Sequence, residues 1–370
     1  MSSTKIISSS FGKNLKVTIF GGSHEPHIGV TIEGLPKGTS IDLNEMQCFL
    51  NRRAPGNNIY STPRKEADKP IVKSGLLDGE TTGLPLTLLI ENTNTRSSDY
   101  SSIRDIPRPA HADFTAYVKY GNQINMSGGG PFSARMTAPL CIAGAIALQI
   151  LESKNIFIGA HISSIAEIED KLFDPVNVSV SELMELKKLT LPVLDLNQGD
   201  LMGKKIEDAQ LNQDSVGGVI ECCAIGVPAG IGGPMYDSLE GHLAQIFFGI
   251  PAVKGLEFGI GFKASKLLGS ENNDAFTMVD GIVQTKTNNH GGILGGISSG
   301  MPITCKLAFK PTPSIGKEQD SISISKGINE KLKIVGRHDP CVVVRAVPIV
   351  EAAMAIGILD LLICDDFYSA

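Results

Sequence analysis

The sequence predicts an α+β protein, a β-α-β sandwich in which two antiparallel sheets enclose helices and the two halves show pseudo-twofold internal duplication. Segment 75–87 matches segment 292–304 without a gap, with identical Gly, Leu, Pro and Thr positions. Gly34-Leu-Pro-Lys-Gly38 likewise resembles Gly226-Val-Pro-Ala-Gly230. Repetition at this distance indicates a duplicated unit rather than a short-period solenoid, and such modules pack economically as sheets covered by helices. The alternative is two unrelated Gly-Pro turns.

The chain shows no linker between its halves. Its 370 residues suffice for one large domain or two ordinary ones. We therefore expect a single domain over residues 1–370, with pseudo-repeat halves of roughly 1–190 and 191–370.

The first half contains strand and helix patterns in alternation. Period-two alternation predicts strands at Leu15–Ile19, Gly29–Glu33, Ile71–Leu77 and Leu84–Glu91. Apolar periodicity and capping residues predict helices after the Asp42–Glu45 capping box, at Ala112–Tyr120 and at Ala138–Ser153. The last helix is hydrophobic nearly all round, so we expect it to be buried.

The second half repeats these patterns. The predicted strands are Val216–Ile225, Val253–Phe262 and Gly281–Gln284. The predicted helices are Ser181–Leu189, a helix capped by Asp237 or Ser238 that runs through Phe248, and Val343–Ile363.

Composition excludes several classes of protein. The net charge of −6 does not indicate a nucleic-acid surface. No run of about 18 apolar residues indicates a membrane span, and Met1–Phe11 lacks the apolar core of a signal peptide. The seven cysteines are dispersed without a C-x-x-C pair, which favours a reducing compartment. We expect a cytoplasmic protein, and the His and Cys spacing does not predict a metal site.

The arginines are segregated along the chain. They occupy positions 52, 53, 64, 96, 104, 108, 135, 337 and 345, so none lies between 136 and 336. Four of the seven histidines, at 24, 27, 111 and 338, fall in the same two regions. Because arginine suits bidentate recognition of phosphate and carboxylate, this predicts one polyanion pocket built from the first third and the last tenth of the chain. The alternative is chance combined with ordinary salt bridges.

Segment 105–135 is the strongest candidate for that pocket. It carries Arg108 and His111 beside prolines, then the triplet Gly128–Gly130, Ser133 and Arg135. Glycines allow close backbone approach to a ligand, and arginines supply forked donors. The alternative is a Pro/Gly-rich loop with a surface histidine.

Three further residues could carry proton chemistry. His24 lies in a glycine-rich turn and could act as a general acid, although a lone histidine is more often structural. Arg108 should lower the pKa of His111 unless an anion intervenes; capping at the start of a helix is the alternative role of this turn. Arg337 would hold Asp339 ionised as a base, unless Asp339-Pro340 is only a turn. Neither a phosphate-binding P-loop nor a dinucleotide fingerprint is present.

Ordered motifs along nearly the whole chain resemble the chorismate synthase family. They are Phe20–His24, Asn51–Gly56, Ser61–Arg64, Arg96–Tyr100, Arg108–Asp113, Ser127–Arg135, Asn289–Gly300 and Gly336–Cys341. The resemblance implies a carbon-oxygen lyase of the shikimate pathway and aromatic amino acid biosynthesis. In this reaction 5-enolpyruvylshikimate 3-phosphate loses phosphate and a ring proton by anti 1,4-elimination, giving chorismate.

The resemblance also implies a cofactor and partners. Reduced FMN (FMNH2) is required without net redox change, and the family fold forms a homotetramer. The family is linked to NADP through flavin reduction, but this sequence has no nicotinamide fingerprint, so we expect an external flavin reductant. The alternative is a non-catalytic flavin- or polyanion-binding relative, and a different phosphate lyase is a third possibility.

Residue roles follow from the same resemblance. His24 would protonate the leaving phosphate, His111 the reduced flavin, and Asp339 would help take the ring proton through flavin N5. The expected flavin contacts are Pro131, Phe132, Ser133, Pro251, Ala252, Gly295, Lys310, Pro311, Thr312, Pro313, Ser314 and Arg337. The expected substrate contacts are Arg53, Arg64, Arg108 and Arg135.

The chain departs from the family pattern at a few positions near these motifs. The family usually has Glu at Gly22, Gly at Glu25 and Gly at Ala110. It usually has Arg-Ser at Pro131-Phe132, and often Asn at Pro251.

Overall fold

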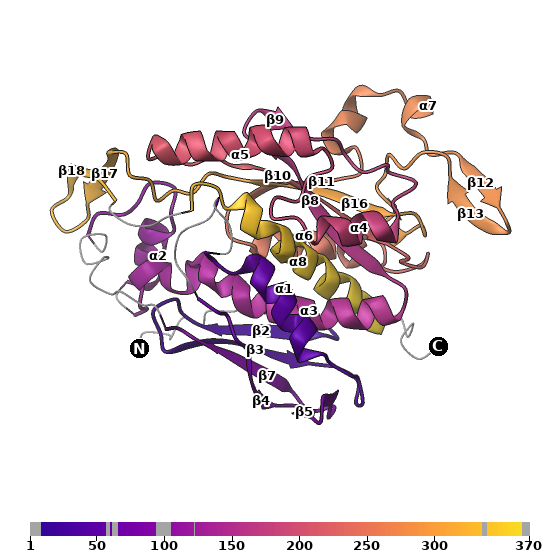
Figure 1. The fold of residues 1–370 in the computed structure, drawn as a ribbon, viewed down its shortest axis with the longest axis horizontal. Coiled ribbons are helices and arrows are strands. Elements are labelled where there is room, and N and C mark those ends of the chain that lie inside the picture. The colour runs from indigo at the N-terminus through magenta and orange to yellow at the C-terminus, as the bar shows by residue number, and fades with distance from the viewer. Residues whose placement is uncertain are drawn as a thin grey trace.

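Two five-stranded sheets with helices packed against them form the body of the protein (Figure 1). The computed structural model describes residues 9–56, 60, 66–93, 105–121, 123–334 and 339–364. Every strand pair within the two sheets is antiparallel. The predicted α+β class is therefore confirmed.

The first sheet has the strand order β1-β2-β3-β7-β4. Its strands are β1 (Ser10–Phe11), β2 (Lys16–Gly21), β3 (His27–Glu33), β7 (Leu86–Glu91) and β4 (Ile71–Ser74). Alternate side chains such as Ile28, Val30 and Ile32 are almost completely buried, as the period-two pattern requires for one face packed on a core. The predicted strand at 71–77 is interrupted at Gly75, whose φ is +83°.

The second sheet has the order β11-β16-β10-β8-β9. Its strands are β11 (Val253–Phe258), β16 (Ile303–Phe309), β10 (Gly218–Ile225), β8 (Phe157–Ile165) and β9 (Ile168–Glu169). The strand predicted to reach Phe262 ends at Phe258, because Gly259 turns into the left-handed region at φ +55° and packs tightly on Asn289.

Two long helices lie between the sheets and form most of the core. Helix α3 (Thr137–Ser153) contacts strands of the first sheet, and α8 (Val343–Cys364) contacts strands of the second. They cross closely, because a Cβ on Gly144 would lie 2.1 Å from the Cβ of Ala352. Both regions are long and apolar enough to cross a membrane, but 72% and 94% of their most apolar windows are buried inside the protein. Such extensive burial is typical of helices in a protein core.

Smaller elements surround this body. The remaining helices are α1 (Leu43–Arg53), α2 (Asp113–Tyr120), α4 (Val180–Leu186), α5 (Leu196–Leu211), α6 (Leu239–Gly249) and α7 (Gly269–Asn272). Short 3-10 turns are η3 (Ser127–Phe132), η4 (Ala134–Met136), η5 (Met235–Asp237) and η6 (Gly261–Lys266). Asp42 caps α1 as predicted, accepting from the backbone N–H of Asn44 and Glu45. Ser238 caps α6.

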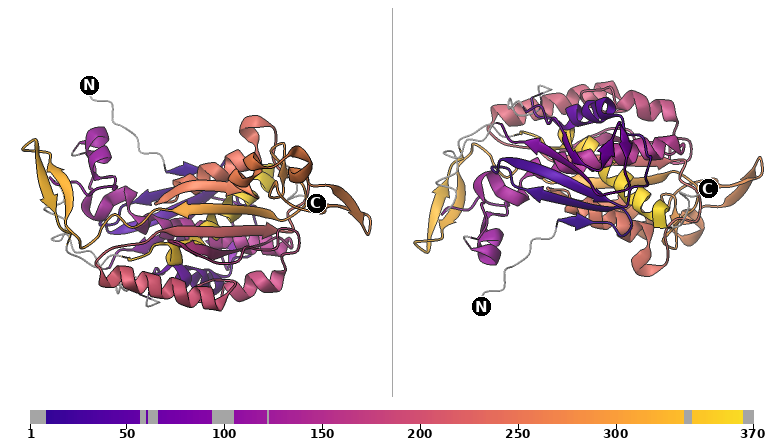
Figure 2. Two further views of the ribbon diagram at one scale, coloured as in Figure 1. Left: turned by 90° about the horizontal axis from the view of Figure 1, so that it is seen from above. Right: turned by 90° about the horizontal axis from the view of Figure 1, so that it is seen from below.

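Two-stranded hairpins complete the structure. They are β5 (Leu76–Leu77) with β6 (Glu80–Thr81), β12 (Phe276–Val279) with β13 (Ile282–Thr285), β14 (Ile293–Leu294) with β15 (Ile297–Ser298), and β17 (Gln319–Ser323) with β18 (Ile328–Leu332). The hairpins β12-β13 and β17-β18 project from opposite ends of the body in both views of Figure 2.

The chain connects the strands of the two sheets in a similar way. In each sheet a short hairpin precedes the last strand along the chain, β5-β6 before β7 and β14-β15 before β16. Each hairpin also makes one isolated bridge at the matching place, Ser40 to Glu80 and Gly232 to Ile297. A long core helix, α3 or α8, comes later along the chain than this last strand in both cases. The second sheet begins with β8 at Phe157, ahead of the expected boundary near residue 190.

Candidate active site

Most of the predicted site residues that the structure describes gather at one end of the body, where α3 and α8 begin. His24 follows β2, and the segment that contains Arg108 and His111 leads into α2. Lys310–Ser314 follows β16, and Asp339 comes just before α8. In Figure 1 this end lies on the left, beside α2. Two sheets and two core helices therefore position one cluster of side chains.

The glycine triplet separates two imidazoles. Gly128, Gly129 and Gly130 have φ values of +63°, +94° and +51°, a region that side chains strongly disfavour. A Cβ on Gly128 would lie 2.0 Å from Cε1 of His24, and one on Gly129 would lie 3.4 Å from Cε1 of His111. The triplet is therefore required both by its backbone conformation and by the space that the His24 ring occupies.

Ser23 determines which nitrogen of His24 carries a proton. The Ser23 hydroxyl donates to the carbonyl of Ser127 at 3.0 Å and lies 3.1 Å from Nδ1 of His24. A hydroxyl has one proton to donate, so Ser23 accepts from Nδ1–H. Nε2 is then the His24 nitrogen that can take up or release a proton.

Asp113 is a site residue that the sequence analysis missed. Its carboxylate accepts from Nε and Nη2 of Arg108 at 2.7 and 2.8 Å, and lies 2.7 Å from Nδ1 of His111. Burial alone would raise the pKa of Asp113, but the hydrogen bonds from Arg108 and His111 hold that pKa well below its ordinary value. Asp113 is thus the anion that contacts both Arg108 and His111, and Nη2 of Arg108 also lies 3.1 Å from Nδ1 of His111. These contacts at Nδ1 leave Nε2 to face Gly129. The Asp two residues after the histidine was the available sequence signal.

Each described arginine forms an ion pair with a carboxylate. The pairs are Arg52–Glu351, Arg53–Asp68, Arg108–Asp113, Arg135–Asp68 with Glu66, and Arg345–Asp339. The salt-bridge alternative therefore accounts for at least one donor of each of these five side chains. Arg64 and Arg337, like Arg96 and Arg104, lie outside the described residues.

Asp68 joins two of the predicted substrate arginines. It accepts from Nη1 of both Arg53 and Arg135 and is almost completely buried. Burial would raise the pKa of Asp68, but the two arginines lower it below its ordinary value. Arg53 also donates to Thr137 at 3.1 Å, whereas Nη2 of Arg135 is buried without a hydrogen-bond partner in the described part of the chain. Arg135 thus retains a donor for a ligand.

Asp339 pairs with Arg345, and the predicted neighbour Arg337 lies outside the described residues. Nη1 of Arg345 lies 2.5 Å from Oδ2 of Asp339, and Nε of Arg345 donates to the carbonyl of Arg53 at 3.0 Å. Burial lowers the pKa of Arg345. These contacts tie the start of α8 to the end of α1.

The loop Lys310–Ser314 contacts the histidine segment directly. Nζ of Lys310 donates to the carbonyl of Ala110 at 3.1 Å, and Nη1 of Arg108 donates to the Ser314 hydroxyl at 3.3 Å. Burial, with a smaller effect from nearby Lys254, lowers the pKa of Lys310. The Thr312 hydroxyl is buried and has no partner among the described residues.

The other predicted flavin contacts divide into two groups. Ala252, next to Pro251, accepts from the backbone N–H of Lys310 at 3.0 Å, and Pro131, Phe132 and Ser133 end the triplet turn. Gly295 does not join them, because it lies in the β14-β15 turn next to the start of α6, while Pro251 follows its end. Helix α6 has 11 residues and so spans about 16 Å at 1.5 Å per residue. Gly295 and Pro251 therefore lie at opposite ends of this length.

Two family departures have a structural counterpart. The side chain of Glu25 lies over Gly22, with Cδ 3.4 Å from where a Cβ on Gly22 would be. Ala110, where the family usually has glycine, has a φ of +57°. The Glu25 carboxylate thus lies beside position 22, where the family usually has a Glu carboxylate. Position 110 retains the backbone conformation of a glycine.

The family model described as chorismate synthase matches residues 15–363. The chain belongs to the chorismate synthase family. It is 47% identical over 368 residues to a chorismate synthase of Lancefieldella parvula, covering 96% of this chain and 97% of the relative. It is 42% identical to that of Methanococcus maripaludis, with 97% and 98% covered. A crystal structure of chorismate synthase superimposes with a TM-score of 0.75 at 26% identity, covering 96% of this chain and 93% of that one.

Membership of the chorismate synthase family carries its activity. The protein is a carbon-oxygen lyase that releases phosphate from 5-enolpyruvylshikimate 3-phosphate and forms chorismate, within aromatic biosynthesis. The family uses reduced flavin. The predicted family and reaction are both confirmed.

Proposed function

We propose that this elimination takes place at the end of the body where His24 and His111 flank the glycine triplet. The observation that supports this site most directly is the pair of imidazoles against consecutive glycines, each ring held through Nδ1 by a neighbour on its own segment. Such a pair leaves two Nε2 atoms for proton transfer at one place. Asp339, held by Arg345, is the third proposed catalytic group.

The residues of this site fit a flavin phosphate and a substrate polyanion. Nη2 of Arg135 and the Thr312 hydroxyl are buried donors without a partner in the described chain, and the triplet presents backbone rather than side chains. Reduced FMN, when bound, supplies the electron density that assists departure of the phosphate without net redox change. The groups proposed to hold it are Pro131–Ser133, Pro251, Ala252, Lys310–Ser314 and Arg337, and Gly295 lies at the opposite end of α6 in the same chain.

The four substrate arginines receive different proposed roles. Arg135 keeps an unused donor and is the best placed of those described to bind a substrate anion. Arg53 donates to Asp68, Thr137 and the carbonyl of Ala134. Arg108 donates to Asp113 and Ser314. Both therefore act mainly by holding these groups and the loops around them. Arg64 remains a prediction from the family motif.

The proposal also includes the internal duplication, the architecture, the assembly and the source of reduced flavin. The shared order of four strands in each sheet, β2-β3-β7-β4 and β8-β10-β16-β11, and the paired hairpins support an internal duplication within one domain over 1–370, with the boundary between Ser153 and Phe157. We also propose the β-α-β sandwich as its architecture, a cytoplasmic homotetramer as its form, and an external reductant for its flavin that takes its electrons from the reduced form of NADP.

Phosphate release tests the proposed site. The protein is mixed anaerobically with 5-enolpyruvylshikimate 3-phosphate and FMN, with and without dithionite, and chorismate is followed by absorbance. We expect product only with reduced flavin, and His111→Ala should lower kcat by about two to four powers of ten. Thr115→Ala, an exposed change on α2, is the matched control. Flavin binding without product would favour the non-catalytic relative, and an active His111→Ala variant would remove His111 from the site.

A further inference from the structure

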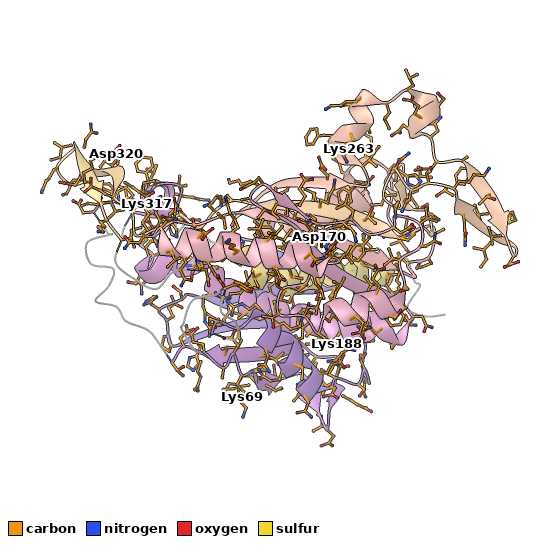
Figure 3. All side chains as sticks on the ribbon, turned by 45° about the horizontal axis from the view of Figure 1, so that its top comes forward. Lys69, Asp170, Lys188, Lys263, Lys317 and Asp320 are labelled. Atoms are coloured by element: carbon orange, nitrogen blue, oxygen red, sulfur yellow. The ribbon has the colours of Figure 1, made fainter. Side chains whose placement is uncertain are left out.

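Asn92 lies one residue beyond β7, where the first sheet reaches the candidate site. Strand β7 ends at Glu91, which pairs with His27 of β3. This sheet is the one beside the label of Lys69 in Figure 3. The backbone N–H of Asn92 donates to the carbonyl of Pro26 at 3.0 Å, so the hydrogen bonding between the strands continues for one more residue. The sheet therefore holds the backbone of Asn92 in place.

The amide nitrogen of Asn92 holds the turn that carries His24. Nδ2 of Asn92 donates to the carbonyl of Gly22 at 3.1 Å and to the carbonyl of Glu25 at 2.7 Å. These two residues stand on either side of His24 in the chain, and the N–H of Glu25 closes the same turn onto the Gly22 carbonyl at 3.0 Å. One side chain therefore fixes both ends of the turn that presents the His24 ring.

The amide oxygen of Asn92 orients Arg135. Oδ1 of Asn92 accepts from Nε of Arg135 at 3.1 Å, while Nη1 of Arg135 contacts Asp68 and Glu66. Because a guanidinium is planar and rigid, contacts at Nε and Nη1 together fix the direction of Nη2. Nη2 is buried and has no hydrogen-bond partner among the described residues. Asn92 therefore helps to determine where Arg135 presents its unused donor.

The two sets of contacts match an asparagine amide atom by atom. A carbonyl can only accept and Nε of arginine can only donate, so the nitrogen of the amide faces the turn and its oxygen faces Arg135. Aspartate has the same shape but no donor for the carbonyls of Gly22 and Glu25. Leucine has neither group, and glutamine is longer by one methylene. The side chain of Asn92 is therefore suited to joining the turn and the guanidinium.

We propose that Asn92 is a positioning residue of the elimination, whose single amide sets the place of the His24 ring relative to Nη2 of Arg135. In the proposed site His24 protonates the leaving phosphate while Arg135 binds a substrate anion, so the separation of these two groups has to suit one substrate. A misplacement of about 1 Å can cost about 10²-fold in rate. This inference rests on the roles proposed for His24 and Arg135, and it adds a residue that acts through both.

Double-mutant cycles on the full-length enzyme test this role, with reduced FMN as cofactor and 5-enolpyruvylshikimate 3-phosphate as substrate. Asn92→Ala should lower kcat about 10²-fold and raise KM about threefold to tenfold, the scale of one lost hydrogen bond. In the His24→Ala background Asn92→Ala should lower kcat no further, and in the Arg135→Ala background it should leave KM unchanged. Asn44→Ala, at an exposed position of α1, is the matched control and should change neither constant.

The results distinguish failure of this role from failure of the proposed site. Wild-type kcat in His24→Ala would remove His24 from the chemistry, and the role of Asn92 would fall with it. An impaired His24→Ala enzyme that loses the same further factor on Asn92→Ala would leave the site standing and show that Asn92 does not act through His24. Asn92→Asp keeps the shape of the side chain without its donors and should lower kcat as Asn92→Ala does. Unchanged kcat in an Asn92→Asp protein that is folded by far-UV circular dichroism would also overturn the inference.

Discussion

Replacing Asp113 by asparagine should separate its effect on chemistry from its effect on stability. Asp113 accepts two hydrogen bonds from the Arg108 side chain and contacts Nδ1 of His111. The Arg108 and Asp113 side chains are 5% and 10% exposed, and breaking a buried ion pair costs about 3–5 kcal/mol. Because asparagine keeps one acceptor oxygen, we expect about 2–3 kcal/mol of lost stability. The asparagine amide can donate to Nδ1, which would move the His111 proton to Nε2 and lower kcat by about 10²–10⁴-fold.

Three measurements distinguish these effects of Asp113→Asn. Nitrogen-15 NMR of His111 should show a change of tautomer, and Asp113→Glu, which keeps the charge, should restore part of kcat. The lowered pKa of Asp113 means that the wild-type contribution is present above the unfolded pKa of about 3.9 and is lost as pH falls through the lower folded pKa. The variant should lack this loss of stability in acid. A kcat within threefold of wild type, with the tautomer unchanged, would refute the reasoning.

Three further substitutions test the glycine and alanine positions. Ala110→Gly removes the strain of an alanine at φ +57°, which is worth about 1–2 kcal/mol. The added glycine also raises the entropy of the unfolded chain, which lowers stability by about 0.4–1 kcal/mol. The first effect is larger, so Tm should rise, and a fall in Tm would contradict this. Gly144→Val should cost about 1–3 kcal/mol or more in urea unfolding, because a Cβ at Gly144 already lies 2.1 Å from that of Ala352; unchanged stability would show that the helices separate freely. Gly128→Ala should lower kcat about as much as His24→Ala while the fold persists, since the new Cβ displaces the His24 ring, and full activity would dissociate the triplet from His24.

The core helix α3 could be predicted because its residues are apolar on nearly every side. Strand β8 could not, although it is the most buried strand of the second sheet. Both of its faces are covered, so its sequence shows no period-two alternation, and a short apolar run does not distinguish strand from helix. Helix α5 was also missed, because its apolar stripe is narrow: only Gly199, Met202, Gly203, Ile206 and Ala209 are buried.

The sequence motifs predicted which segments form the candidate site, but they did not predict which carboxylates pair with its arginines. Among the described residues, Arg53 and Arg135 meet on Asp68, Arg108 lies beside His111, and the triplet lies against His24 and His111. Which acids oppose the arginines depends on contacts between distant segments: Asp68 lies in a polar loop region and meets Arg135 only in the folded chain. The sequence contains no pattern that predicts the contact between Asp68 and Arg135.

The pairing of arginines with acids determines how the site responds to ionic strength. Arg53 and Arg135 are offset by Asp68 and Glu66, so this cluster has no net formal charge. The whole chain carries −6. Long-range steering of a polyanion follows net charge and is screened over about 8 Å in physiological salt. Capture of a phosphorylated substrate therefore gains little from long-range attraction, and its association rate should vary little with salt, because recognition begins only on contact.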